Sequence, residues 1–180
     1  MLTTSASASY RRPRRFLRAL FLWLALYAAT VTLYNFSYRF TSETLIKRLQ
    51  VQPAAFLIRQ TLPEVPIHYT ATAIRSPTLK LQIMRGCDGV EAWLLLVTAV
   101  VVFPVPARRR MAGVLYGTLL IMGLNLIRIV SLFHLAMKKP EWFELAHVMI
   151  WQSAMVLAAI AFVVIWMDPR AVGRASETRA

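Results

Sequence analysis

Four long apolar segments constrain the fold of this chain more than any other feature. A helix needs about 20 apolar residues to cross a bilayer, and the segments 19–36, 90–105, 111–137 and 146–167 meet or approach that length. Of the 180 residues, 58% are apolar and 16% are charged, whereas soluble proteins carry about 25% charged residues. The excess apolar surface must face lipid. We therefore expect an all-α integral membrane protein, a bundle of four transmembrane helices.

The charged ends of the chain suggest three parts. Residues 1–18 form a basic cytoplasmic tail, residues 19–167 a single transmembrane domain, and residues 168–180 a second cytoplasmic tail. The first span follows a basic stretch, as a secretory signal peptide would. Its apolar run is too long for the hydrophobic region of a signal peptide, and no cleavage site of small residues follows the run. We therefore interpret the segment as a retained signal anchor.

Arginines next to the spans predict the orientation. Five lie within residues 11–18, three form the triplet 108–110, and three more follow the last span at positions 170, 174 and 179. With four spans these clusters share one side, and the positive-inside rule makes that side cytoplasmic. The net charge of +13 is thus distributed as topology determinants and not as one exposed face, which argues against nucleic acid as a partner.

The insert between the first two spans, residues 37–89, would then lie outside. Ser42 is a candidate N-cap for a short amphipathic helix, and Pro53 a candidate start for another, both lying along the membrane surface. Residues 67–72 and 79–83 alternate between apolar and polar side chains around a Ser-Pro turn. This pattern predicts a β-hairpin whose second strand leads directly to Cys87.

The topology brings three reactive side chains to one depth. Cys87 lies at the outer mouth of the second span, and His147 opens the fourth from the same side. Arg128 stands 17 residues beyond Met111, a rise of about 25 Å through a hydrocarbon core of about 30 Å. A thiol needs a base to form thiolate, His147 can take and return the proton, and Arg128 can stabilise an oxyanion.

Four further residues are candidates for supporting this set. Asn125 and Ser131 lie three residues either side of Arg128 and form one polar stripe with it. Glu91 is placed to pair with Arg128 or to cap its own helix. Asp88 adjoins the thiol and should raise its pKa, unless Arg85 or Arg128 neutralises the carboxylate.

These residues resemble a known family. The run Gly86-Cys87-Asp88-Gly89-Val90-Glu91-Ala92, then Phe103-Pro104 with a basic turn, Asn125-Leu126-Ile127-Arg128-Ile129, and His147 together look like the core of the exosortase and archaeosortase family. The resemblance covers roughly residues 67–167, and the compact size is most similar to exosortase H.

The resemblance implies a bacterial inner-membrane cysteine transpeptidase or protease. Its substrates would be exported proteins with a C-terminal sorting signal, meaning a short motif, a transmembrane helix and a basic cluster, cut at the periplasmic face through a thioacyl intermediate. Cys87 would be the nucleophile, Arg128 the oxyanion or substrate partner and His147 the acid/base. Whether water or a lipid or glycan amine resolves the intermediate stays open, and no metal or cofactor is implied.

The sequence departs from this family in two respects. Many relatives have about eight spans, so a four-span chain leaves open an active unit made of several copies. Asp88 stands where many members have a Cys-Ser-Gly pattern.

The alternative class is a nonenzymatic membrane scaffold or lipid-binding protein, in which Cys87 only packs. His134 and His68 are expected to be interfacial and solvated residues, respectively.

Overall fold

The computed structural model describes residues 6–103 and 105–167 as a mostly helical chain with one small sheet. In chain order the elements are α1 (Ala6–Thr41), the π-helical η1 (Ser42–Val51), α2 (Gln52–Thr61), β1 (His68–Tyr69), β2 (Ala73–Arg75), β3 (Lys80–Gln82), α3 (Val90–Val102), α4 (Ala107–Lys138), the 3-10 turn η2 (Pro140–Trp142), the π-helical η3 (Leu145–Ile150) and α5 (Trp151–Met167).

Among the described residues, three helical stretches are long and apolar enough to cross a membrane, and they cover Leu17–Thr61, Ala107–Lys138 and Pro140–Trp166. The expected span at 90–105 is shorter, because α3 ends at Val102. Phe103, which precedes a proline, is extended with φ −71° and ψ 143°, as the proline ring disfavours a helical residue before it. With 13 residues, α3 rises only about 20 Å.

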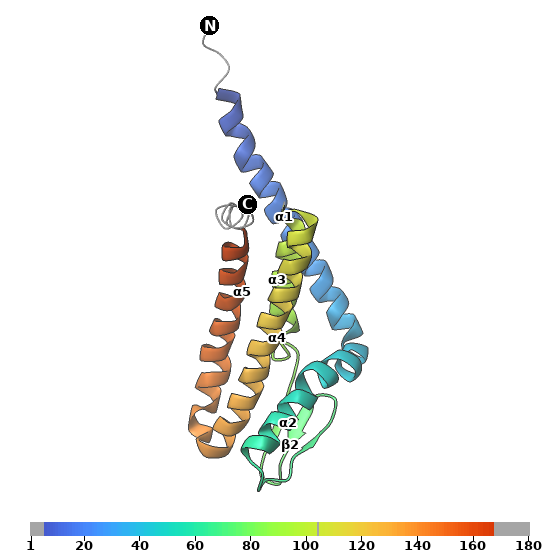
Figure 1. Ribbon diagram of the computed structural model, residues 1–180, viewed down its shortest axis with the longest axis vertical. Helices are drawn as coiled ribbons and strands as arrows, with labels where there is room; N and C mark the ends of the chain where they lie inside the picture. The colour runs from blue at the N-terminus through green and yellow to red at the C-terminus, as the bar shows by residue number, and fades with distance from the viewer. Residues whose placement is uncertain (1–5, 104, 168–180) are drawn as a thin grey trace, which may run out of the picture.

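The two ends of the described chain lie toward the same end of the molecule, and α1 extends beyond the bundle there (Figure 1). Helices α3, α4 and α5 lie side by side, with α1 running along α3, while α2 and the sheet lie at the opposite end. The Ala6 end of α1, the turn between α3 and α4 and the Met167 end of α5 share one end of the bundle. The arginine triplet 108–110 is at that end. The predicted tail 168–180 and its arginines lie outside the described residues.

The helical part of the insert differs from the prediction. The chain stays helical from Ala6 to Thr61, so α1 begins within the stretch predicted as the basic tail, 1–18. Ser42 is not an N-cap: Thr41 before it is helical, and the Ser42 hydroxyl donates to the carbonyl of Arg39 at 2.9 Å. The chain instead changes direction through η1 (Figure 1). Pro53 lies in the first turn of α2, as predicted.

The predicted hairpin is part of a three-stranded antiparallel sheet, ordered β1-β2-β3. Its Ser-Pro turn joins β2 to β3, where the amide of Ser76 donates to the carbonyl of Leu79 at 2.8 Å. The first alternating run is interrupted, because a second tight turn closes from the amide of Thr70 to the carbonyl of Ala73 at 2.8 Å. In the resulting register Ile74 faces Leu81, and both side chains are buried.

Two separate apolar clusters hold the molecule together, one at each end. The cluster at the sheet end joins η1, α2 and the sheet to Ile129 and Phe133 of α4. The other joins α3, α4 and α5 through residues such as Leu96, Ile121 and Ala159. Helix α4 belongs to both clusters, and its residues between Ile121 and Ile129 cross from one to the other. Asn125 and Arg128, the two buried polar residues of α4, lie in this interval.

The contact of α3 with α4 gives a stability prediction. A Cβ at Gly117 would lie 2.3 Å from Cδ2 of Leu96, which is fully buried, whereas a Cβ at Gly123 would meet nothing within 4 Å. Gly117→Ala should therefore destabilise the protein by about 1–3 kcal/mol through overpacking. Gly123→Ala should stabilise the same helix by about 0.5–1 kcal/mol. Thermal unfolding in detergent, followed by circular dichroism, would show equal midpoints for the two variants if this packing were incorrect.

Candidate active site

A tight loop carries Cys87 between β3 and α3. Gly86 and Gly89 flank it with φ of +81° and +79°, a conformation that favours glycine. The amide of Cys87 donates to the carbonyl of Met84 at 2.9 Å, which closes the turn. A Cβ on Gly89 would lie 2.9 Å from the Cβ of Asn125. The loop can therefore sit directly against α4 only because residue 89 is glycine.

The thiol of Cys87 faces the imidazole of His147. Sγ lies 3.0 Å from Nε2, within hydrogen-bond distance, although 60 residues separate the two in sequence. His147 is on η3, and its ring stacks on Phe143 at 5.5 Å between centroids and 19° between planes. Single π-helical turns inside helices occur often at functional sites. Here the wide turn and the stacking fix the ring that faces the sulfur.

Arg128 completes the predicted set. Its Nη2 lies 3.7 Å from Sγ of Cys87, and the side chain is only 2% exposed. Its Nε is buried without a hydrogen-bond partner among the described residues. A buried guanidinium that is only partly satisfied is costly. Because this Nε is unpaired, Arg128 still has a donor for a further hydrogen-bond acceptor.

A small polar pocket lies beside this guanidinium. It has a volume of about 70 Å³, and its polar lining includes Glu91, Arg128 and Gln152. Gly86 and Gly89 of the cysteine loop also line it. A water needs roughly 10–15 Å³ and two to four polar partners, so the pocket has the room and the polar groups to hold ordered water beside the guanidinium.

Asp88 has a structural role in addition to the predicted effect on the thiol. Its carboxylate is fully buried, accepts a short hydrogen bond from the Tyr34 hydroxyl, and accepts the amide of Val90 at 3.0 Å. The side chain thus ties the loop to α1 and to the first turn of α3. Burial raises the pKa of Asp88, against the opposing effect of these two hydrogen bonds.

The pKa of the Cys87 thiol is raised, first of all because burial disfavours the thiolate. The charge of Arg128 opposes this rise, while Asp88 and Glu91 add to it. The predicted influence of Asp88 is therefore present, but it is smaller than that of burial. Arg85 does not neutralise the carboxylate, since its guanidinium stacks over the ring of Tyr38 at 5.1 Å. The thiol is mostly protonated at neutral pH, so it needs the imidazole as a base.

The supporting residues divide into two groups. Asn125 is fully buried and donates to Oε1 of Gln50 at 3.4 Å, so it joins α4 to η1 beside the loop. Glu91 lines the polar pocket with Arg128. Ser131 does not join the site, because its hydroxyl donates back to the carbonyl of Arg128 at 2.9 Å. The predicted polar stripe is therefore shorter than expected.

The other two histidines lie away from the thiol. His134 contacts the hydroxyl of Thr61 at 2.9 Å and the carbonyl of Val130 at 2.8 Å, so it faces α2. His68 is exposed on β1. Within residues 6–103 and 105–167, no group of three or more histidine, cysteine or acidic side chains is arranged to hold a metal ion.

Sequence reasoning missed two polar residues of this region. Tyr34 holds Asp88 from α1, 54 residues away, and Gln152 lines the pocket from α5. Gln152 carried a signal, because it is a polar amide near the start of an otherwise apolar span. Tyr34 carried none, since tyrosine is ordinary in a membrane helix.

Comparison with protein-family models, with curated proteins and with solved structures gives no match.

The raised thiol pKa predicts how Cys87 reacts. Alkylation by iodoacetamide should rise with pH around a midpoint above the ordinary thiol pKa of about 8.5, because burial penalises the thiolate. Arg128→Gln removes the charge that opposes this shift, so the midpoint should move higher still. Arg128→Lys keeps a positive charge, so its midpoint should lie between those of Arg128→Gln and the unmodified chain. Because the chain has one cysteine, total alkylation reports this site alone.

Arg75→Gln provides the matched control, since Arg75 is an exposed cation on β2. This variant should alkylate like the unmodified chain. A midpoint at or below the ordinary thiol value, or equal curves for the variants at positions 75 and 128, would contradict the described electrostatics.

Proposed function

We propose that the protein is a membrane-embedded cysteine transpeptidase or peptidase of the exosortase type. The single observation that carries the proposal is the contact of Cys87 Sγ with His147 Nε2 at 3.0 Å and with Arg128 Nη2 at 3.7 Å. Nucleophile, base and fixed cation are the groups that acyl transfer by cysteine uses. They meet in a protein whose described residues include three helical stretches long enough to cross a membrane.

The contacts support a specific sequence of steps. His147 Nε2 accepts the thiol proton while Sγ attacks the carbonyl carbon of the scissile amide. The carbonyl oxygen takes up the negative charge beside the guanidinium of Arg128. The imidazolium then gives its proton to the leaving amine, the carbon–nitrogen bond breaks, and a thioester remains. Water or an amine, deprotonated by His147, attacks the thioester and releases the thiol.

The substrate part of the proposal comes from the family resemblance. The substrates are exported proteins with a C-terminal sorting signal, and the cut lies on the periplasmic side of the bacterial inner membrane. The grouping of the arginine triplet 108–110 with the ends of α1 and α5 supports an orientation with this end in the cytoplasm (Figure 1). The cysteine loop is nearer the opposite end.

A nonenzymatic scaffold is the rival reading. It would explain the apolar helices and the net charge, but it gives no reason for a buried arginine beside the thiol whose Nε has no hydrogen-bond partner among the described residues. A buried charge of this kind in a membrane helix is by default functional. The processing experiment below separates the two classes.

The orientation has its own test. Reporter fusions after residue 60 and after residue 108, using alkaline phosphatase and green fluorescent protein in parallel, should give periplasmic activity at the first site and cytoplasmic fluorescence at the second. The reason is the excess of arginine near residue 108. The reversed pattern would place Cys87 near the cytoplasm and remove the substrate assignment.

The enzymatic proposal predicts loss of processing in three variants. Coexpression with a tailed substrate should give a shortened product with the unmodified chain and none with Cys87→Ala. His147→Ala should lower the rate about 10²–10⁴-fold by removing the general base, and Arg128→Gln about 10²–10³-fold by removing an oxyanion donor. The measurement is the ratio of processed to unprocessed substrate on an immunoblot over time.

His134→Ala is the matched control, because His134 also lies on the sheet side of the bundle but contacts Thr61 instead of the thiol. Its processing should equal that of the unmodified chain. Normal processing by both Cys87→Ala and Cys87→Ser would exclude the mechanism and leave the scaffold.

A further inference from the structure

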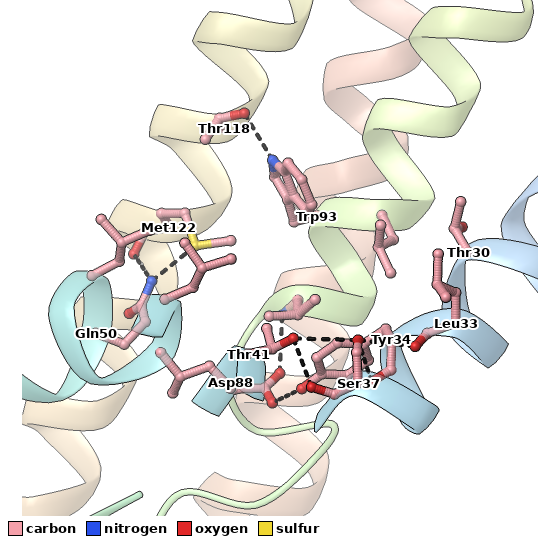
Figure 2. A pocket seen from close by; sticks show the side chains of 15 residues that line it. Thr30, Leu33, Tyr34, Ser37, Thr41, Gln50, Asp88, Trp93, Thr118 and Met122 are labelled. Carbon is pink, nitrogen blue, oxygen red and sulfur yellow. Dashed lines mark hydrogen bonds between the residues drawn. The ribbon is translucent and has the colours of Figure 1, made fainter. Parts of the chain in front are cut away.

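A second cavity, larger than the pocket beside Arg128, lies away from the thiol. It has a volume of about 380 Å³ and is enclosed by α1, η1, α3 and α4 (Figure 2). Cys87, Arg128 and His147 do not line it; of the cysteine loop, only Asp88 does. Binding pockets for small organic molecules measure roughly 300–1,000 Å³. The cavity is therefore large enough to be a site of its own.

The polar side chains around this cavity already have partners. Tyr34 donates to Asp88 at one end, and Nε1 of Trp93 donates to the hydroxyl of Thr118 at 2.8 Å at the other (Figure 2). The Gln50 amide donates to Sδ of Met122 at 2.9 Å. The hydroxyls of α1 donate to carbonyls of their own helix. A guest therefore finds few free hydrogen-bonding groups, which favours an apolar guest over water or a polar ligand.

The length of the cavity matches one leaflet of a bilayer. Its lining on α1 runs from Thr30 to Thr41, a rise of about 16 Å, and half of a hydrocarbon core is about 15 Å. A volume of 380 Å³ over that length suits one extended hydrocarbon chain. It does not suit a transmembrane helix, which is about 10 Å across with its side chains.

The side of the cavity is continuous with the surface that faces the bilayer. Leu33 on α1 is 68% exposed, and Leu45 and Leu49 on η1 are each 55% exposed, although all three line the cavity. Phe36 and Phe40 extend the same apolar surface along α1. Lipid chains thus reach the opening without crossing water, and η1 closes the end of the cavity nearer the sheet.

We propose that this cavity binds one acyl chain of a bilayer lipid from the leaflet on the sheet side. The chain lies along α1 between η1 and α3 and fills space that α3, α4 and the first span leave between them. Its neighbours on the loop side are Tyr34 and Asp88, so the bound chain packs against the hydrogen bond that anchors the cysteine loop. The site does not depend on the proposed function.

The test is photo-crosslinking in lipid vesicles. The protein is reconstituted with phosphatidylethanolamine that carries a diazirine in the middle of one acyl chain, irradiated, and mapped by mass spectrometry. Crosslinks should concentrate on the cavity residues Trp93 and Met122 relative to Leu157 and Val164, which are exposed on α5. Thr30→Trp, which fills the inner end, should lower crosslinking at Met122 by about tenfold.

Thr32→Trp is the matched control, because Thr32 lies two residues along α1, is exposed and does not line the cavity; it should leave the crosslinks unchanged. Leu94→Trp, filling from α3, provides a second variant, and a normal alkylation rate of Cys87 shows that each variant has folded. Cys87→Ala should crosslink normally even if processing fails. Equal labelling of the cavity and α5, or equal crosslinking of Thr30→Trp and Thr32→Trp, would overturn the proposal. In a separate experiment, a photoreactive residue at Leu33 should capture lipid. Capture of a second protein chain instead would also overturn the proposal.

Discussion

The burial of Arg128 is the constraint on which the rest of the structure depends. A charge inside a membrane helix costs at least about 2.5–3.5 kcal/mol, and this one is 2% exposed. It lies where two apolar clusters meet on α4, between Ile121 of one and Ile129 of the other. Neither cluster could hold a guanidinium within itself. The junction between them is the place where polar groups can gather, and the cysteine loop, Asn125 and the small polar pocket all lie there.

The position of the Asp88 carboxylate follows from this constraint. If that carboxylate paired directly with Arg128, it would occupy the donors that face the thiol. Tyr34 and the amide of Val90 hold its oxygens instead, so Arg128 keeps its contact with the sulfur. The charge of Asp88 still acts on the thiol through space. The loop therefore gains an anchor to α1 while the guanidinium remains available beside Cys87.

The features that depend on local sequence were predictable, and those that depend on distant contacts were not. Apolar length predicted four spans, of which three are long enough among the described residues, while α3 is shorter because the chain leaves the helix before Pro104. Depth along the helices predicted that Cys87, Arg128 and His147 would lie together. The N-cap at Ser42 was wrong because a serine hydroxyl can equally bond a carbonyl of its own helix. The anchoring role of Asp88 was not predictable, since its partner Tyr34 lies 54 residues away on another helix.

The short α3 explains how a thiol can be recessed in a protein of this size. Helix α3 has 13 residues and starts three residues after Cys87, whereas α4 has 32 residues and continues ten beyond Arg128. Ten residues of helix add about 15 Å, so the sulfur lies well below the end of α4, between the bundle and the sheet cluster. Cys87 and His147 are each half-buried at this position, while Arg128 is buried, so the contacts of the thiol are partly shielded from solvent and are stronger than they would be in water. The pocket of about 70 Å³ lies on the other side of the cysteine loop, where Gly86, Gly89 and Arg128 line it, and it has room for ordered water beside the guanidinium.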